Sequence, residues 1–467
     1  MTEYHLLIDG ALEAGAATID VVNPATARAF ATAPRADRAQ LDRAVAAARR
    51  AFPAWAALGY PARRERLEAF ADAVAARFDD FVALLTLEQG KPLAQAAHEI
   101  GGTIAALRYF AAQTLEPHVI RATDLERITE HRAPLGVVAA ITPWNFPMIL
   151  LMLKVAPALV TGNTVIAKPA ATTPLTTLLL GEVAAPILPA GVFQTIADAN
   201  DLGAALAAHT GVAHVSFTGS TATGKKVLVA TADRLARSTL ELGGNDAALV
   251  LDDADVATVA PGIFAAAMLN AGQVCLAAKR VYAPASLYEA LCAALAALAD
   301  AAVVGDGLEP GTQIGPVQNR VQYEKVLGYL ADARNSGRII AGGEAIARDG
   351  YFIAPTIVRD IGDSASLVRE EQFGPVLPIL SYDTLDEAIE RINASDYGLG
   401  GTVWTADPAR GEDVARRIDS GTIWVNRHLD LPFDVAFGGA KQSGIGRQQG
   451  LAGLEEFTQA RVVNVAL

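Results

Sequence analysis

Between positions 137 and 242 the sequence alternates between short apolar runs rich in β-branched residues and longer stretches of helical pattern. The predicted strands are 137–141, 164–167, 192–196, 214–217 and 238–242. Such alternation is typical of βαβ units, which build a parallel, doubly wound sheet. Ligands of these sheets bind at the carboxyl ends of the strands. Functional residues are therefore expected directly after these runs.

The regions on either side of this alternation have different patterns. A second alternating series, 247–426, predicts another α/β domain. Ala-rich segments with apolar residues at spacings of three and four predict amphipathic helices upstream, so the N-terminal quarter is expected to be mainly helical. These predicted helices are 41–55, 65–87 and 93–115. Two further segments, 126–132 and 461–465, look extended and lie outside both series.

Length and charge narrow the class of protein. At roughly 150 residues per domain, 467 residues suggest two or three domains. The 38 basic and 51 acidic residues give a net charge of −13, which disfavours nucleic acid as the main partner.

Cysteine use and hydropathy indicate where the protein works. Two cysteines form no disulfide framework, and no spacing typical of a metal site occurs. The most apolar stretch, 146–160, is too short to span a bilayer and contains Lys154. The first five residues lack the basic flank and apolar run of a signal peptide. We expect a cytoplasmic protein without a metal or a membrane partner.

Cys275 is a candidate nucleophile, and Glu241 lies 34 positions before it. A free thiol has a pKa of ~8.5, so a catalytic cysteine must be activated by its surroundings. A carboxylate base would provide that activation and make the protein an enzyme that works through a thioester. A lone cysteine is more often a small buried apolar residue, and Glu241 alone can be an ordinary surface or helix-capping carboxylate. The pair by itself leaves both interpretations open.

A glycine-rich turn, 217–226, follows one predicted strand and opens a helix. Free backbone amides and the helix dipole suit a phosphate at such a place. The segment from Gly219 to Lys225 nearly matches a nucleotide-hydrolase phosphate loop, but Lys226 stands where the magnesium-binding hydroxyl belongs. This mismatch disfavours a nucleotide hydrolase. A tight turn without any ligand remains an alternative for the motif alone.

Seven short motifs occur in a fixed order along the chain. They are PWNFP at 143–147, KP at 168–169, FTGS at 217–220, ELGGN at 241–245, GQVC at 272–275, EQFGP at 371–375 and FGGAKQSG at 437–444. In order and spacing this set resembles the aldehyde dehydrogenase superfamily over essentially the whole chain. The resemblance implies an α/β fold with a doubly wound cofactor-binding domain (1–115 and 135–243), an α/β catalytic domain (244–443) and a small β oligomerisation region (116–134 and 444–467). It also implies a homodimer or homotetramer, although 126–132 and 461–465 can equally be edge strands within one subunit.

The resemblance implies a mechanism that runs through Cys275. The thiolate attacks an aldehyde to give a thiohemiacetal, whose oxyanion is held by the amide of Asn145 and the backbone N–H of Cys275. Hydride transfer to the nicotinamide leaves a thioester, which a water activated by Glu241 hydrolyses to the acid. Lys154 corresponds to a lysine on the family's proton path from this base. Retention of Glu241 argues against the branch that passes its acyl group to coenzyme A.

The resemblance also implies NAD or NADP as cofactor. The expected cofactor-binding residues are Trp144, Lys168, Gly219, Ser220, Leu242, Glu371 and Phe373. The expected walls of the substrate channel are Phe146, Leu150, Leu153, Leu269, Val274, Leu276 and Leu431. An apolar channel favours a medium-sized aliphatic or aromatic aldehyde. Near its mouth, Arg427, His428 and Asp430 are candidates to recognise a polar tail, and the sequence does not choose between a semialdehyde and an amino aldehyde.

Three positions depart from the family pattern. Ala171 replaces a glutamate that holds the 2′-hydroxyl of NAD, which suggests use of NADP as well as NAD, or a preference for NADP. Asp198 opposes this inference if its carboxylate faces the cofactor, because it would repel a 2′-phosphate. Gln448 replaces a glutamate on the proton path and cannot titrate. A nucleotide hydrolase and a non-catalytic protein on the same fold are the competing classes.

Overall fold

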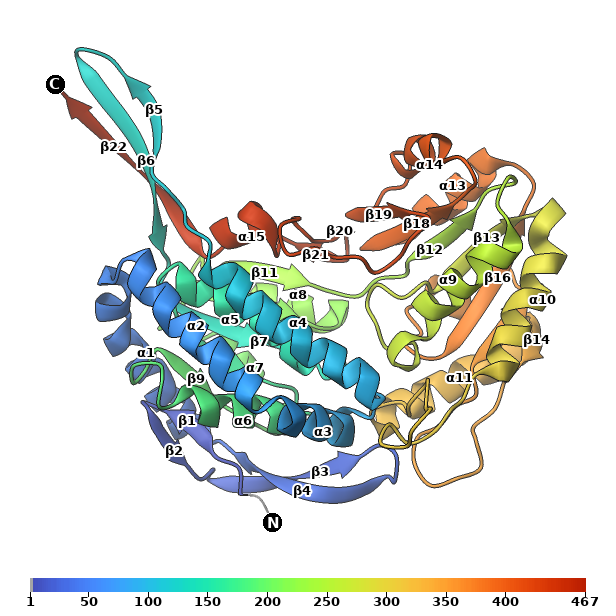
Figure 1. Ribbon diagram of the computed structural model, residues 1–467, viewed down its shortest axis with the longest axis horizontal. Helices are drawn as coiled ribbons and strands as arrows, with labels where there is room; N and C mark the ends of the chain where they lie inside the picture. Colours follow the sequence, from blue (N-terminus) through green and yellow to red (C-terminus); the bar gives the residue numbers. More distant parts are fainter. Residues whose placement is uncertain (1–2) are drawn as a thin grey trace.

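The computed structural model describes residues 3–467, so the first two residues of the predicted cofactor domain lie outside the described part. Figure 1 shows two lobes, each built on its own sheet, and a narrow three-stranded sheet that projects from one of them. One hydrophobic core gathers residues from Leu6 to Leu242 together with Leu454 and Phe457. Two further cores draw only on residues between Ala247 and Ile418. The chain therefore changes lobe between Leu242 and Ala247.

The first lobe contains an eight-stranded sheet with a parallel centre. In spatial order its parallel strands are β9 (Phe193–Thr195), β8 (Thr164–Lys168), β7 (Val137–Ile141), β10 (His214–Thr218) and β11 (Arg237–Glu241). Antiparallel strands close both edges: β1 (Leu6–Ile8) and β2 (Ala11–Glu13) at one, β21 (Gly444–Ile445) at the other. The doubly wound prediction is confirmed, since β7, β8 and β10 are buried along their whole length, as parallel strands between helix layers should be.

Helices cover this sheet. They are α1 (Arg38–Ala57), α2 (Tyr60–Ala76), α3 (Phe78–Gln89), α4 (Leu93–Ala111), α5 (Pro147–Val160), α6 (Leu175–Ala184), α7 (Gly203–Ala207) and α8 (Thr221–Ala232). One sequence prediction is wrong here. The single helix predicted over 65–87 is broken at Arg77, whose φ of −111° and ψ of 21° leave the helical region. The N-terminal quarter is mainly helical, as predicted, although it begins with strands that include the hairpin β3 (Ala17–Asn23) and β4 (Arg28–Arg35).

The second lobe contains a seven-stranded sheet, which confirms the second α/β series. Its spatial order is β14 (Arg338–Ala341), β15 (Thr356–Arg359), β16 (Val376–Tyr382), β13 (Arg280–Pro284), β12 (Ala247–Val250), β18 (Gly400–Trp404) and β19 (Thr422–Val425). Its helices are α9 (Val256–Met268), α10 (Ala285–Ala301), α11 (Arg320–Ser336), α12 (Ser366–Arg369), α13 (Leu385–Asn393) and α14 (Pro408–Ala415). The small pair β17 (Tyr397–Gly398) and β20 (Ala440–Lys441) leads the chain back to β21 and α15 (Gly450–Glu455).

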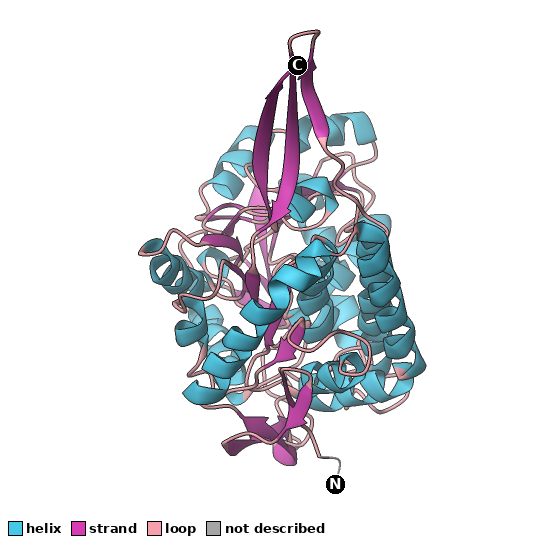
Figure 2. Cartoon of the chain, turned by 90° about the vertical axis from the view of Figure 1, so that its left-hand side faces the viewer, coloured by secondary structure: helices cyan, strands magenta, loops and turns pink. Residues whose placement is uncertain are grey.

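The projecting sheet joins two segments that are distant in sequence. β22 (Thr458–Ala466) pairs along its whole length with β6 (Glu126–Pro134), which also pairs with β5 (His118–Ala122). Figure 2 shows this sheet standing clear of the helices, with the C-terminus near its tip. The two segments predicted as extended are therefore neighbouring strands within one chain.

Candidate functional site

The strand ends of the first sheet meet the second lobe at a cleft. The last residues of the parallel strands β8, β10 and β11 are Lys168, Thr218 and Glu241, so all three lie at the carboxyl ends of the strands. Two cavities of about 520 and 180 Å³ lie at these strand ends. They share five lining residues, namely Pro143, Trp144, Thr218, Gly219 and Ser220, and therefore form one continuous cleft.

The larger cavity fits a nucleotide. It lies at the start of α8, where the Ser220 hydroxyl accepts the N–H of Thr223 at 3.3 Å and caps the helix. The remaining amides of the first turn and the helix dipole favour a phosphate there. Small apolar side chains from α7 and α8, including Ala204 and Val227, line the far end, where a flat base can pack. Of the predicted cofactor residues, this cavity brings together Trp144, Lys168, Gly219 and Ser220.

Asp198 contacts Lys168 rather than the cavity. The Lys168 ammonium lies 2.6 Å from an oxygen of Asp198, which is fully buried, and also donates to the carbonyl of Pro169 at 3.1 Å. None of the residues that line the larger cavity is acidic, and Lys226 stands among them. The negative charge considered a barrier to a 2′-phosphate is thus neutralised by a cation.

The smaller cavity is lined by Cys275 together with Leu242, Glu371 and Phe373. The Glu371 carboxylate accepts the N–H of Gly244 at 3.0 Å. A Cβ placed at Gly243 would lie 2.5 Å from this carboxylate, so glycine is required for Glu371 to hold its position. The rings of Trp144 and Phe373 stand at 89° to each other with centroids 5.4 Å apart, and form an aromatic wall.

Cys275 follows a strained backbone segment. The short 3₁₀ segment Leu269–Gly272 contains Asn270 and Ala271 in the left-handed region, at φ of 52° and 55°. Gly272 has φ of 72°, and a Cβ there would lie 2.1 Å from the carbonyl oxygen of Gly374. Such conformations cost about 1–3 kcal/mol each and persist only where the surroundings enforce them.

The surroundings of Cys275 keep its thiol protonated at rest. Desolvation raises the pKa of Cys275 to about 12, although the nearby Lys279 ammonium acts in the opposite direction. Reaction of the sulfur therefore requires a base that removes its proton. The other cysteine, Cys292, lies on the buried face of α10, in the core of the second lobe, and lines neither cavity of the cleft.

Asn145 has a free donor next to the cysteine. Its side-chain nitrogen donates one N–H to the carbonyl of Gln273 at 2.9 Å, and Asn145 itself is buried. The second N–H of this amide remains available to a bound group. Asn145 lines the same small cavity as Cys275, so the predicted oxyanion donor and the sulfur are brought together.

Two buried residues that the sequence did not single out position Asn145. Lys91 donates to the backbone carbonyl of Asn145 at 2.9 Å and pairs with Glu99 at 2.5 Å. Glu99 in turn accepts the N–H groups of Met148 and Ile149 in the first turn of α5. No motif marks Lys91 and Glu99 as partners of Asn145, because Lys91 lies in the turn after α3 and Glu99 lies on α4, both far from Asn145 in sequence.

Glu241 and Lys154 form a buried pair of titratable groups. Both oxygens of Glu241 lack a hydrogen-bond partner, and burial raises its pKa to about 8, an effect that the Lys154 charge reduces. Burial lowers the pKa of Lys154 to about 7, and its ammonium donates to the Thr218 hydroxyl at 2.7 Å. The side-chain nitrogen of Gln448 is buried without a partner. Among these groups, Lys154 has a pKa matched to proton exchange with Glu241.

The predicted channel residues separate into two groups. Phe146, Leu269, Val274, Leu276 and Leu431 cluster with Cys275, while Leu153 packs in the first core and Leu150 lies partly exposed on α5. The loop residues Arg427 and Asp430 form an ion pair with each other. Burial lowers the pKa of His428 to about 4, so its ring is neutral, and it lies 2.6 Å from the carbonyl of Leu276.

The cleft runs from a nucleotide-sized cavity to a smaller one lined by Cys275, Asn145 and Glu371, whereas Glu241 and Lys154 line neither cavity. This arrangement fits a nucleotide-dependent oxidoreductase with a sulfur nucleophile. The model of the "Aldehyde dehydrogenase family" matches residues 12–463. The chain therefore belongs to the aldehyde dehydrogenase family. It is an NAD(P)-dependent enzyme that oxidises an aldehyde to the carboxylic acid, and the nucleotide-hydrolase alternative is not supported.

Individual relatives agree over the full length. Betaine aldehyde dehydrogenase of Cereibacter sphaeroides is 38% identical over 457 residues, 97% of this chain and 94% of the relative. A putative aldehyde dehydrogenase from Burkholderia cenocepacia has a TM-score of 0.97 at 37% identity and covers 100% of this chain and 98% of its own. The NAD⁺ complex of an aldehyde dehydrogenase from Bacillus cereus has a TM-score of 0.97 at 35% identity, with 100% and 97% coverage. Within the described residues, no helix has the length and apolar character needed to cross a membrane.

Proposed function

We propose that Cys275 is the nucleophile that attacks the aldehyde. The observation that carries this proposal is the shared small cavity in which Cys275 lies with Asn145, Glu371 and Phe373. Trp144, Lys168, Gly219, Ser220, Leu242, Glu371 and Phe373 hold the cofactor, which accepts a hydride when bound. Cys275 then carries the acyl group as a thioester.

Asn145 and the backbone N–H of Cys275 stabilise the oxyanion of the thiohemiacetal. Replacing Asn145 with Ala is expected to lower kcat about 10²- to 10³-fold, because one preorganised donor is worth about 3 kcal/mol in the transition state. Leu150→Ala serves as a control, because it shortens a nearby apolar side chain on α5 that lines neither cavity and removes no donor. Steady-state rates of both variants, measured by absorbance at 340 nm, provide the test. An unchanged kcat in Asn145→Ala would show that the oxyanion is held elsewhere.

Glu241 activates the water that releases the acid. Its unpartnered oxygens are free to accept a proton from water, and Lys154 passes that proton toward Thr218 and solvent. The proposed path needs no titratable group at Gln448, whose amide stays a spectator. The support is the pair of pKa values, about 8 for Glu241 and about 7 for Lys154, which allow transfer between them near neutral pH.

NADP is accepted as well as NAD. The supporting observation is that the larger cavity has two lysines and no acidic residue among its walls, while Asp198 is paired with Lys168. Ala171 lies beside the lining residue Ala170, and its N–H donates to the lining residue Asn200 at 3.4 Å. A carboxylate introduced by Ala171→Glu is therefore expected to weaken NADP binding about tenfold or more, by repelling the 2′-phosphate, and to leave NAD binding within about threefold. Ala171→Gln is the matched neutral control. Dissociation constants from fluorescence titration measure both, and equal weakening of NADP by Glu and Gln would contradict the electrostatic explanation.

The substrate is a medium-sized aliphatic or aromatic aldehyde. Five of the seven predicted channel residues cluster with Cys275 and are all apolar. Arg427 and Asp430, two of the loop residues considered for recognition of a polar tail, are paired with each other. Betaine aldehyde, which is named for one relative, carries a cation. The test is to compare kcat/KM of this protein for betaine aldehyde with kcat/KM for neutral aliphatic and aromatic aldehydes, and the neutral aldehydes should give the higher values.

The projecting sheet mediates assembly into a homodimer or homotetramer, and the division into cofactor, catalytic and oligomerisation regions follows the ranges given above. Val119, Ile120, Val462 and Val463 are exposed large apolar side chains on this sheet. One exposed apolar side chain is ordinary, but several on an isolated three-stranded sheet form a surface that favours association with another chain. Light scattering after size-exclusion chromatography should give two or four chains per particle.

The low cysteine content supports a reducing, cytoplasmic location.

A further inference from the structure

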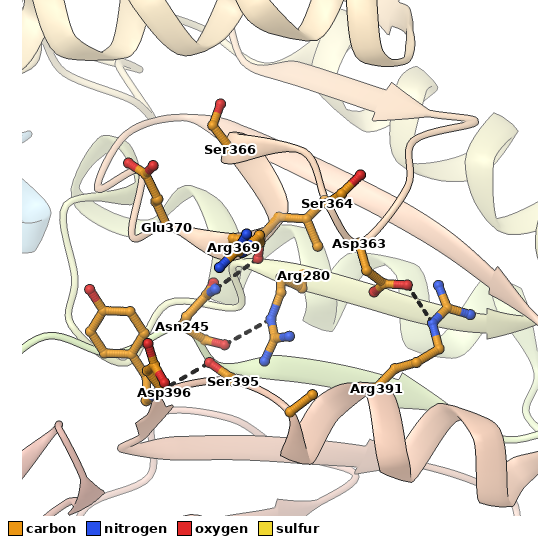
Figure 3. Close-up of a pocket in the computed structure, with 13 residues that line it drawn as sticks. Asn245, Arg280, Asp363, Ser364, Ser366, Arg369, Glu370, Arg391, Ser395 and Asp396 are labelled. Carbon is orange, nitrogen blue, oxygen red and sulfur yellow. Dashed lines mark hydrogen bonds and ion pairs between the residues drawn. The ribbon is translucent and has the colours of Figure 1, made fainter.

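A separate cavity of about 630 Å³ lies in the second lobe. Figure 3 shows its polar lining, which comes from the segments around β12, β13, α12 and α13. Arg280, Arg369 and Arg391 contribute guanidinium groups, and Asp363, Glu370 and Asp396 contribute carboxylates. No part of the proposed dehydrogenase chemistry uses this cavity.

Arg280 is buried in the wall of the cavity without a carboxylate partner. It is 5% exposed, and its guanidinium donates to the backbone carbonyl of Asn245 at 3.0 Å and to the hydroxyl of Tyr282 at 3.3 Å. Among the described residues no carboxylate forms an ion pair with Arg280 or with Arg369. Arg391, in contrast, is neutralised by Asp363 at 2.7 Å and Glu387 at 2.9 Å. A buried arginine without a counterion is unusual, because charged groups are rarely buried unless they are paired.

Asn245 supplies a second unsatisfied group beside this arginine. It is 2% exposed, its side-chain nitrogen donates to the carbonyl of Val368 at 2.8 Å, and its side-chain oxygen has no partner. Figure 3 shows Asn245 beside Arg280, with Arg369 in the same lining. Buried polar atoms are normally satisfied, and an unpaired one in a cavity marks a place for a polar guest. The free Asn245 oxygen needs a hydrogen-bond donor on that guest.

We propose that this cavity binds a small molecule with one oxyanion and at least one hydrogen-bond donor. The oxyanion, a carboxylate or a phosphate, is bound by Arg280 and Arg369, whose planar groups suit such oxygens. The donor, a hydroxyl or ammonium group, pairs with the side-chain oxygen of Asn245. Glu370 and Asp396 at the same cavity repel further negative charge, so polyanions such as nucleotides are disfavoured.

The cavity is connected to the cofactor site through the backbone. Asn245 directly follows Gly244, whose N–H holds the Glu371 carboxylate, and Arg369 and Glu370 directly precede Glu371. Arg280 directly follows Lys279, which lies 3.7 Å from Glu371 and donates to the carbonyl of Cys275. A guest that draws Arg280 and Arg369 together therefore acts on the segment that holds Glu371. Binding of the anion and binding of NAD are expected to alter each other's affinity by the same factor.

The test is a calorimetric titration of the full-length protein with glycolate and, separately, with inorganic phosphate. Both titrations are run with saturating NAD, so that the anion cannot enter the phosphate-binding turn at α8. We expect one-to-one binding of at least one of the two probes, and the comparison separates a carboxylate from a phosphate ligand. Arg369→Gln, at an exposed and unpaired position, should weaken binding about tenfold or more, as loss of a charge-assisted contact does.

Arg280→Gln should also weaken binding about tenfold or more, and two further variants keep the test decisive if this buried substitution prevents folding. Arg280→Lys retains the charge but loses the two-pronged geometry, and it should also weaken binding. Arg338→Gln removes an exposed arginine on β14, outside the cavity lining, and should leave binding unchanged. Failure of both probes to bind in the presence of NAD, or wild-type affinity in Arg369→Gln, would overturn the proposal. This readout does not depend on dehydrogenase activity, so it stands or falls separately from the catalytic roles proposed above.

Discussion

Replacing Cys275 with Ala is expected to abolish aldehyde oxidation, with a loss of activity on the order of 10⁴-fold or more. No other thiol lines the cleft, because the second cysteine, Cys292, lies on the buried face of α10. Without the sulfur of Cys275, no thiohemiacetal forms to hold the carbon that gives up the hydride. The measurement is the rise in absorbance at 340 nm with NAD and an aldehyde at saturation.

Two controls separate chemistry from folding. Cys292→Ala should retain full activity and lose about 1 kcal/mol of stability, since it removes one small buried group. Cys275→Ala should still bind NAD with wild-type affinity, which fluorescence titration reports. Oxidation at an undiminished rate in Cys275→Ala would refute the assignment of the nucleophile.

Glu241→Gln is expected to separate the two halves of the reaction. The first turnover should still produce about one equivalent of reduced cofactor per site, with water as the base that takes the thiol proton. The steady-state rate of aldehyde oxidation should then fall by about 10²- to 10⁴-fold, because no general base activates the water that hydrolyses the thioester. Rapid-mixing absorbance measurements detect the burst, and mass spectrometry of the quenched protein should find the acyl group on the Cys275 peptide. Loss of the burst together with turnover would instead make Glu241 the base for the thiol.

The wild-type enzyme should show a pH dependence that follows Glu241. A general base must be ionised, and a pKa of about 8 leaves only about a tenth of Glu241 ionised at pH 7. Steady-state kcat should therefore rise with pH through about 8 when hydrolysis of the thioester limits the rate. Lys154→Met removes a positive charge that lowers the pKa of Glu241, so the rise should move to higher pH. The shift should be small, because a pKa of about 7 leaves only about a tenth of Lys154 charged at pH 8. The matched control is Lys225→Met, which replaces an exposed lysine on α8 that donates to Gln442 and is not among the charges acting on Glu241.

The sequence predicted the centre of the first lobe because local pattern and tertiary role agree there. Strands buried on both faces, such as β7 and β10, are continuous apolar runs, and their ends coincide with the predicted motifs. It failed where packing overrides pattern. The break at Arg77 has no glycine or proline to mark it, and short β1 and β2 of three residues each have too few positions to show a period.

The candidate site shows the same division. Residues inside motifs, such as Cys275 and Asn145, could be predicted as site residues because each motif keeps its chemistry within a few positions. Lys91, in the turn between α3 and α4, and Glu99, on α4, act on Asn145 from a distant part of the sequence, and their contact exists only after the chain has folded. The pairing of Asp198 with Lys168 is of the same kind, since it depends on where the loop after β9 turns. Long-range contacts of this type leave no spacing in the sequence that identifies them.

The position of β21 also bears on how the enzyme is made. β11 carries Glu241 at the edge of the parallel sheet, and the strand that covers this edge pairs Gly444 with Glu241 and Ile445 with Leu240. During synthesis the N-terminal lobe emerges first, so this edge stays open while the whole second lobe is translated. An open strand edge is a template for pairing with other chains. The nascent protein therefore carries an open strand edge at the strand that ends in the proposed general base until β21 has been made.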